Sequence, residues 1–183
     1  MRGLGCRLHA RGIRQAGRIA GPGMDILIRL IAEWGLLVPA ACVTIVTLLR
    51  RRWFTDIADG ASGGLATIVL VKISGALYDE PRPFVVEHIR PLIPHVADNA
   101  FPSDHLAATG LAFAYLWPRS KPLAVLVFVM ALLIGSARVL AHLHWPLDVT
   151  VGFMLGVIGL FAGNAIVRAI PALHSRMEPP RPR

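Results

Sequence analysis

Five long apolar runs, separated by short polar connections, dominate the chain. The runs cover residues 26–49, 60–78, 102–117, 122–141 and 146–170. Each is long or apolar enough to form a helix in lipid, where about 20 residues cross the hydrocarbon core. The third run is short and reaches that length only if its polar start, residues 101–105, lies at the membrane interface. The pattern predicts an all-α, polytopic membrane helical bundle with about five transmembrane helices.

The two ends of the chain are polar and differ from the apolar middle. Residues 1–23 carry five arginines among glycines and lack the continuous apolar core of a secretory signal. Met24 directly precedes the first apolar run, so a natural start at Met24 is one interpretation and an interfacial basic helix is the other. We therefore divide the chain into a basic segment, 1–23, a membrane domain, 24–172, and a polar tail, 173–183.

Basic residues at the ends of the apolar runs predict the orientation of the bundle. They follow the first run, separate the third from the fourth and follow the fifth: Arg50, Arg51, Arg52, Arg119, Lys121, Arg168 and Arg176. An odd-even count places all of them on one side, which the positive-inside rule identifies as cytoplasmic. The loop 79–101 and the turn 142–146 then lie at the outer face of a bacterial cytoplasmic membrane. The arginines before Met24 would also lie on that outer side, which favours the later start.

The composition agrees with a bilayer as the solvent. Hydrophobic residues make up 55% of the 183 residues, and the mean hydropathy of +0.58 exceeds the usual soluble range. The formal charge of +8 raises the alternative of nucleic-acid binding, but the Lys and Arg residues lie mainly at the ends of apolar runs and in the N-terminal stretch. We therefore expect membrane lipids, and no nucleic acid, as partners. Cys6 and Cys42 indicate neither a metal site nor a disulfide framework.

Ionisable side chains inside or at the edge of lipid are costly, so each is a candidate for function. One group spans the start of the fifth run: Arg138, His144 and Asp148. Pro146 suits the first turn of a helix, which places His144 just before that turn and Asp148 within it. A carboxylate that holds one imidazole nitrogen leaves the lone pair of the other free to attack phosphorus. The alternative is a helix-start aspartate, favoured by the helix dipole, beside a loop histidine.

A second group begins the third run. If Pro102 starts a helix, the unpaired backbone N–H groups of Ser103 and its neighbours point outward and can hold an anion. The Ser103 hydroxyl adds a donor, and His105 can protonate a leaving oxygen as a general acid. The alternative is a helix cap with an incidental histidine.

Cationic residues accompany both groups. Lys72 lies deep in the second run, Arg82 follows it, and Arg138 precedes His144. Fixed positive charge suits phosphoryl transfer, and an arginine can hold two phosphate oxygens at once. The alternatives are a snorkelling Lys72 and, for Arg138, a cation near a helix C-terminus. Neither alternative explains why cationic and histidine side chains converge on one membrane face.

Metal binding is the competing interpretation of the histidines. His142 and His144 could join His105 and Asp148 as ligands of a divalent cation. The Lys and Arg residues in the same region would repel such a cation and suit an anion. We therefore predict a site that uses no metal and no other cofactor.

Together these residues resemble the type 2 phosphatidic acid phosphatase superfamily, whose motifs run Lys…Arg-Pro, then Pro-Ser-Gly-His, then Ser-Arg…His…Asp. The similarity covers roughly residues 65–160. It implies that His144 is the nucleophile, that Asp148 is its partner and that His105 is the proton donor. It also implies phosphate contacts for the remaining candidates: Lys72, Arg82, Ser103 and Arg138.

Three positions depart from those motifs. Asp104 stands where the general motif has Gly, and Ala137 stands where a Ser would precede the arginine of the third motif. The gap from Lys72 to Arg82 is also longer than the usual one. Because of this longer gap, the phosphate-binding role implied for Lys72 depends most on where the folded chain places its side chain.

Two segments narrow the resemblance to one branch. Pro-Arg-Pro-Phe at 81–84 and Phe-Pro-Ser-Asp-His at 101–105 resemble the undecaprenyl-diphosphatases associated with bacitracin resistance. That resemblance implies hydrolysis of undecaprenyl diphosphate to undecaprenyl phosphate and phosphate through a phosphohistidine, which regenerates the cell-wall lipid carrier outside the cytoplasm. The enzymatic alternative is a broader lipid phosphatase acting on phosphatidylglycerophosphate or phosphatidate. The alternative of another class is a transporter or scaffold that binds an anionic lipid without cleaving it.

Overall fold

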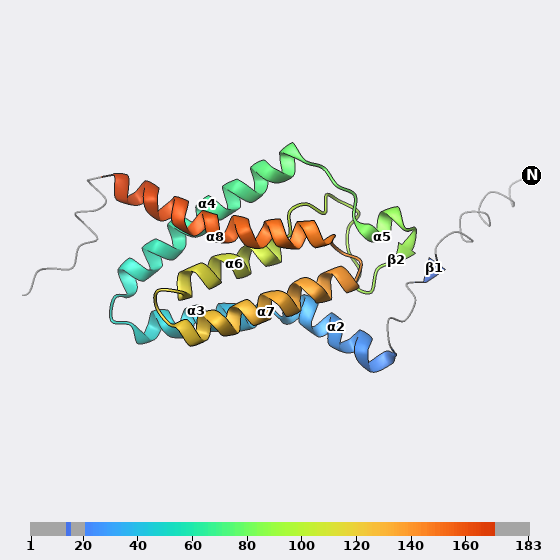
Figure 1. The fold of residues 1–183 in the computed structure, drawn as a ribbon, viewed down its shortest axis with the longest axis horizontal. Coiled ribbons are helices and arrows are strands. Elements are labelled where there is room, and N and C mark those ends of the chain that lie inside the picture. Colours follow the sequence, from blue (N-terminus) through green and yellow to red (C-terminus); the bar gives the residue numbers. More distant parts are fainter. Residues whose placement is uncertain (1–13, 16–20, 171–183) are drawn as a thin grey trace, which may run out of the picture.

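The computed structural model describes residues 14–15 and 21–170, which form a bundle of helices with one very short sheet (Figure 1). The helices are α2 (Pro22–Trp34), α3 (Leu37–Leu49), α4 (Trp53–Leu77), α5 (Pro83–Val86), α6 (Asp104–Leu116), α7 (Lys121–Leu140) and α8 (Pro146–Ala169). The strands β1 (Arg14–Gln15) and β2 (Ile89–Arg90) pair in parallel. The predicted all-α class is confirmed.

The two boundaries of the predicted three-part division lie near the ends of the chain. Helix α2 begins at Pro22, so the predicted boundary at Met24 lies within the first turn of that helix. The tail 173–183 and most of the basic segment 1–23 lie outside the described residues. The division therefore stays a prediction.

The first apolar run forms two helices, and the prediction of a single one is wrong. Helices α2 and α3 meet at a bend of 41° around Gly35. In a continuous helix Pro39 would remove the bond to the Gly35 carbonyl, whereas the first turn of a new helix tolerates it. A side chain at Gly35 would also collide with the carbonyl of Ile31 and with Ile134 of α7. The unbroken apolar pattern concealed this bend, because hydropathy does not report backbone geometry.

Among the described residues, three helices are long and apolar enough to cross a membrane by length and composition: α4 with 25 residues, α7 with 20 and α8 with 24. The bent pair of α2 and α3 passes the same test together, as one broken span or as a re-entrant loop, and gives a fourth span in the first case. Helix α6 has 13 residues, which gives a length of about 20 Å against a hydrocarbon core of about 30 Å. The expectation of five spans is therefore corrected to three or four around a short central helix.

Helix α6 lies between the other long helices, with α4 and α8 on one side and α3 and α7 on the other (Figure 1). Glycines of α8 allow the backbones to approach closely. A side chain at Gly156 would collide with the Ala107 carbonyl of α6, and one at Gly159 would collide with Thr67 of α4. Small residues commonly form such contacts between membrane helices. This packing holds the amino end of α6 against α8.

The predicted loop 79–101 is packed against the bundle and carries both α5 and β2. Its buried side chains Phe84 and Ile93 belong to one apolar cluster with Ala137 and Leu143, at the end of α7 and just after it. Burial of such side chains stabilises the packed arrangement of the loop. The loop therefore brings its polar residues to the same end of the bundle as the turn between α7 and α8.

Candidate active site

The carboxyl ends of α4 and α7, the amino end of α6, the loop between α4 and α6 and the turn before α8 surround a cavity of about 400 Å³. Its lining comprises Val71, Lys72, Gly75, Arg82, His95, Asp98, Asn99, Phe101, Pro102, Asp104, His105, Arg138 and His144. Five of the seven predicted site residues thus line one cavity. The other two, Ser103 and Asp148, are fully buried beside it. The structure brings the candidates together, while their chemical roles stay predictions.

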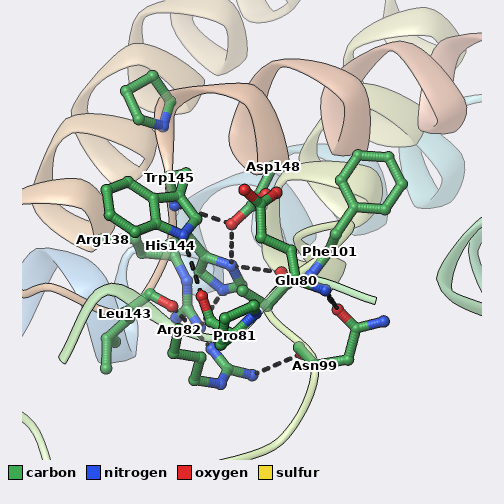
Figure 2. Close-up of polar contacts among 12 residues, drawn as sticks. Glu80, Pro81, Arg82, Asn99, Phe101, Arg138, Leu143, His144, Trp145 and Asp148 are labelled. Atoms are coloured by element: carbon green, nitrogen blue, oxygen red, sulfur yellow. Dashed lines mark hydrogen bonds and ion pairs between the residues drawn. The ribbon is translucent and has the colours of Figure 1, made fainter. Parts of the chain in front are cut away.

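His144 lies in the turn between α7 and α8, and its imidazole is held at both nitrogens (Figure 2). Nδ1 lies 2.8 Å from the Ala100 carbonyl oxygen and 3.5 Å from Oδ2 of Asp148. Both of these groups accept hydrogen bonds, so Nδ1 carries the proton and Nε2 carries the lone pair. The sequence predicted that Asp148 fixes one tautomer, but not which nitrogen carries the proton. The closer acceptor is a backbone carbonyl for which the sequence offered no side-chain signal.

Asp148 combines both interpretations that the sequence left open. Its Oδ2 accepts a hydrogen bond of 2.8 Å from the Trp145 N–H and so caps the start of α8. The same oxygen faces Nδ1 of His144. The hydrogen bond from the Trp145 N–H therefore holds the carboxylate in the position from which it contacts the imidazole. A group that is rigidly held in this way can orient its partner without reorganising during a reaction.

Arg138 is in the last turn of α7 and is 5% exposed. Its Nη1 donates to the Ala32 carbonyl of α2 at 3.1 Å, and its Nη2 lies 3.2 Å from Nε2 of His144. Its Nε is buried and has no hydrogen-bond partner among the described residues. The guanidinium thus binds a carbonyl near the end of α2. The alternative interpretation, a cation near the C-terminus of its own helix, assumed contacts with α7 instead. The guanidinium also places positive charge beside the histidine lone pair.

Arg82 is 6% exposed, and the neighbouring loop surrounds its guanidinium. It donates to Asp98 at 2.7 Å and to the Leu143 carbonyl at 2.9 Å, with a longer contact of 3.4 Å to the Asn99 carbonyl. Burial opposes ionisation of Asp98, but the hydrogen bond and charge of Arg82 hold the pKa of Asp98 below its usual range. Arg82 therefore fixes the residue before His144 while it lines the cavity.

The start of α6 differs from its prediction. The helix begins at Asp104, with Ser103 as the capping residue, and the prediction that Pro102 starts it is wrong. The Ser103 N–H donates to the backbone carbonyl of Asp148 at 3.1 Å, so this amide is not free for an anion. The Ser103 hydroxyl is buried and has no partner among the described residues. The following amides belong to the first helical turn, where backbone donors lack intrahelical partners.

Lys72 lines the cavity despite its long separation from Arg82. Helix α4 continues to Leu77, and Gly75, about one turn after Lys72, lines the same cavity. The additional residues thus extend the end of α4 without turning Lys72 away from the cavity. The unusual gap does not remove this lysine from the site.

Two polar residues of the loop contribute to the site although the sequence did not predict them. Asp98 pairs with Arg82, and Asn99 connects the loop to the end of α4. The Asn99 amide donates to the Gly75 and Tyr78 carbonyls, while its side-chain oxygen accepts from the N–H groups of Glu80 and Phe101. An isolated Asp or Asn in a loop carries no recognisable spacing, so only the folded contacts reveal these roles.

The surroundings of His144 favour its neutral form. Burial lowers the pKa of His144, and the positive charges of Arg138 and Arg82 lower it further. The hydrogen bonds to Asp148 and to the Ala100 carbonyl act in the opposite direction without reversing the shift. An imidazole with a depressed pKa keeps Nε2 unprotonated at neutral pH. This is the state that a nucleophile requires.

Among the described residues, no group of three or more His, Cys, Asp or Glu side chains is arranged to hold a metal ion. The histidines at the cavity are interleaved with lysine and arginine side chains. The chemistry available to these groups is binding of an anion, nucleophilic attack by an imidazole and transfer of a proton.

The PAP2 superfamily model matches residues 60–171 of this chain, a segment that contains all seven predicted site residues. Undecaprenyl-diphosphatase BcrC of Bacillus subtilis (strain 168) is 35% identical over 137 residues, which is 74% of this chain and 70% of that protein. The similarity therefore extends well beyond the short motifs.

Two solved structures share the fold. LpxE of Aquifex aeolicus superimposes with a TM-score of 0.64 at 24% identity, covering 82% of this chain and 90% of that one. A PAP2-type phosphatidylglycerolphosphate phosphatase of Bacillus subtilis gives a TM-score of 0.57 at 21% identity, covering 85% and 82%. At these identities the likeness concerns the fold alone.

Proposed function

The chain belongs to the PAP2 superfamily, and we propose that it hydrolyses undecaprenyl diphosphate to undecaprenyl phosphate and inorganic phosphate. The observation that carries this proposal is the state of His144, whose Nδ1–H is held by two acceptors and whose Nε2 lies beside Arg138 at a cationic cavity. The substrate class is supported by the similarity to an undecaprenyl-diphosphatase over most of the chain.

In the first step Nε2 of His144 attacks the terminal phosphorus, and the bond from that phosphorus to the bridging oxygen breaks. Arg138 Nη2, 3.2 Å from Nε2, is in reach of the oxygens of a phosphorus bonded to Nε2. The leaving lipid phosphate takes a proton from His105, which lines the same cavity. Because His105 lies among cationic side chains, it gains that proton most readily together with the anionic substrate.

In the second step water attacks the phosphohistidine, and the Nε2–phosphorus bond breaks. The now neutral His105 takes a proton from the attacking water, as microscopic reversibility requires. Asp148 stabilises the positive charge on the imidazole in the intermediate, because its Oδ2 faces Nδ1. Inorganic phosphate leaves, and His144 returns to its starting tautomer.

We propose that the site faces the exterior of the cytoplasmic membrane. Six of the basic residues used to predict the orientation fall within the described residues, at or next to the ends of helices at the opposite end of the bundle, where α3 and α8 end and α4 and α7 begin (Figure 1): Arg50, Arg51, Arg52, Arg119, Lys121 and Arg168. The positive-inside rule supports a cytoplasmic position for that end. A diphosphate released outside the cytoplasm would then reach the cavity directly.

The test is phosphate release by the purified protein from undecaprenyl diphosphate, phosphatidylglycerophosphate and phosphatidate. We expect the diphosphate to be the preferred substrate, and we expect His144→Ala to lose at least about 10⁴-fold in kcat, as removal of a nucleophile does. His88→Asn is the matched control, because His88 lies in the outer loop with φ 53°, a conformation that Asn tolerates. Near-normal turnover by a folded His144→Ala protein would contradict the nucleophile, and preference for another lipid would contradict the substrate.

A further inference from the structure

Glu80 lies between the end of α4 and Arg82, and its side chain points at Asp148 (Figure 2). Neither the motifs nor the proposed reaction uses this residue. Its Oε2 and the Oδ1 of Asp148 are both buried, and neither has a hydrogen-bond donor among the described residues. Two ionised carboxylates are acceptors only and repel each other. One proton between them satisfies both oxygens.

The backbone holds Glu80 in this position. Its N–H donates to the Asn99 side chain at 3.1 Å, and its carbonyl accepts from the Ala100 N–H at 2.8 Å. The Ala100 carbonyl in turn accepts from Nδ1 of His144. Glu80 and His144 are therefore attached to the same residue from opposite sides. These hydrogen bonds fix the backbone of Glu80 relative to His144, so the position of Glu80 near Asp148 is set by the fold of the site.

We propose that Glu80 acts as a neutral carboxylic acid that donates a hydrogen bond to Asp148 and so positions the Asp148–His144 pair. The inference rests on the proposed function, in which His144 is the nucleophile. Glu80 does not touch the reacting atoms and is a positioning residue. It fixes Oδ1 of Asp148, while the Trp145 N–H fixes Oδ2.

The charged surroundings favour a single shared proton. Burial raises the pKa of Glu80, and the negative charge of Asp148 raises it further. A hydrogen bond from the Tyr78 hydroxyl acts in the opposite direction. The titratable groups facing Glu80 are thus Tyr78 from the end of α4 and Asp148 from α8, with His144 beyond Asp148.

This arrangement predicts a specific pH effect. When pH rises through the raised pKa of Glu80, this side chain loses its proton and a second negative charge appears beside Asp148. The hydrogen bond is lost, the two carboxylates move apart and His144 loses its fixed orientation. Turnover should therefore fall at alkaline pH more steeply than deprotonation of the general acid His105 alone would cause. Glu80→Gln should remove this additional decline, because its amide keeps a donor but does not titrate.

The kinetic experiment compares Glu80→Gln, Glu80→Leu and the matched control Asp79→Asn, whose exposed carboxyl is the preceding residue. We expect Glu80→Leu to lower kcat on the order of 10- to 100-fold, as loss of a hydrogen bond to a charged group does, with KM nearly unchanged. Glu80→Gln should stay within about threefold of wild type, and Asp79→Asn should match wild type throughout. A Glu80→Gln profile that keeps the full alkaline decline, or a Glu80→Leu protein with normal kcat, overturns the proposal.

Infrared spectroscopy separates this inference from the proposed function. The wild type should show the carbonyl band of a protonated carboxyl group, shifted in deuterated water and absent from both Glu80→Gln and Asp148→Asn. Absence of the band from the wild type across its active pH range overturns the carboxyl pair even if the enzyme is active. Presence of the band in a protein that releases no phosphate from any of the lipids supports the pair and contradicts the reaction.

Discussion

The two ends of the helical bundle use charged residues in opposite ways. At the end far from the cavity, Arg119 pairs with Asp56 at 3.0 Å and with Asp59 at 2.7 Å, and Arg50 also pairs with Asp56 at 3.0 Å. Two arginines meet two aspartates, so the charges compensate. This network joins the start of α4 to the connection between α6 and α7.

At the cavity end, the charges do not compensate in the same way. Arg82 pairs with Asp98, but among the described residues the hydrogen-bond partners of Arg138 are neutral: the Ala32 carbonyl and Nε2 of His144. Burying a charge without a counterion is costly, and such a group is commonly retained for an anionic ligand. The difference indicates a structural network at one end and a binding site at the other.

The comparison also refines the orientation argument. Arg119 entered the count of basic residues on the cytoplasmic side, yet its side chain is 8% exposed and fully engaged by two aspartates. Arg51, Arg52 and Lys121 remain exposed at that end. The positive-inside argument therefore depends on those exposed residues more than on Arg119.

The sharpest way to break the comparison is to remove one arginine from each end. Arg138→Gln should reduce kcat by about 10²- to 10³-fold, because a preorganised donor to the transition state is lost. Its thermal stability should change less than that of Arg119→Gln, since loss of the hydrogen bond to the Ala32 carbonyl is offset by removal of a buried charge without a counterion. Arg119→Gln should keep normal kcat but lose about 1.5–3 kcal/mol of stability, because Asp56 and Asp59 each lose a hydrogen bond to a charged group while Arg50 still pairs with Asp56. Phosphate release and thermal unfolding measure the two effects, and a reversed pattern would refute the division between the ends.

A smaller effect is expected from the two lysines. Lys72→Met should lower kcat/KM about tenfold by removing one charge from the cavity wall. Lys121→Met is the matched control, because Lys121 lies at the far end with its Nζ 3.5 Å from the ring centroid of Trp117. Steady-state kinetics on the lipid diphosphate distinguish them. Equal kinetics for both variants would exclude Lys72 from phosphate binding.

The smallest expected effect is a shift in the acid limb of the pH profile. Burial, Arg138 and Arg82 lower the pKa of His144, so its nucleophilic neutral form persists to a pH below its ordinary value of about 6.5. Activity should therefore be lost only as pH falls through this lowered pKa. In Arg138→Gln the limb should move to higher pH, because one positive charge no longer opposes protonation. Profiles of kcat/KM against pH measure the limb, and an unchanged limb in that variant would contradict the electrostatic cause.

The helices were largely predictable because long apolar runs require helical backbone in lipid. The start of α4 was placed too late, at residue 60, because Asp56 and Asp59 interrupt the apolar pattern. Their pairing with Arg119 makes them compatible with the helix, and this partner is 60 or more residues away in the chain. The length of α6 was predictable, but its central position was not, since hydropathy does not distinguish a buried helix from one that faces lipid.

The chemistry of the site was partly visible in its side chains. Histidine, lysine and arginine in recognisable spacing predicted the residues around the cavity. The contacts that set their state involve the Ala100 carbonyl, the Asn99 side chain and the Glu80 carboxyl, none of which belongs to a pattern. Every residue has a backbone carbonyl that can accept a hydrogen bond, so the residue type does not indicate which donor that carbonyl will contact.

The sequence by itself determined that this protein is a helical membrane protein and which ionisable groups it has for phosphate chemistry. These properties follow from composition and spacing, which are local. Only the tertiary structure decided which nitrogen of His144 carries the proton, that Arg138 lies beside the other, and that Glu80 approaches Asp148. Protonation states depend on burial and on neighbours brought from distant helices, and those exist only in the folded chain.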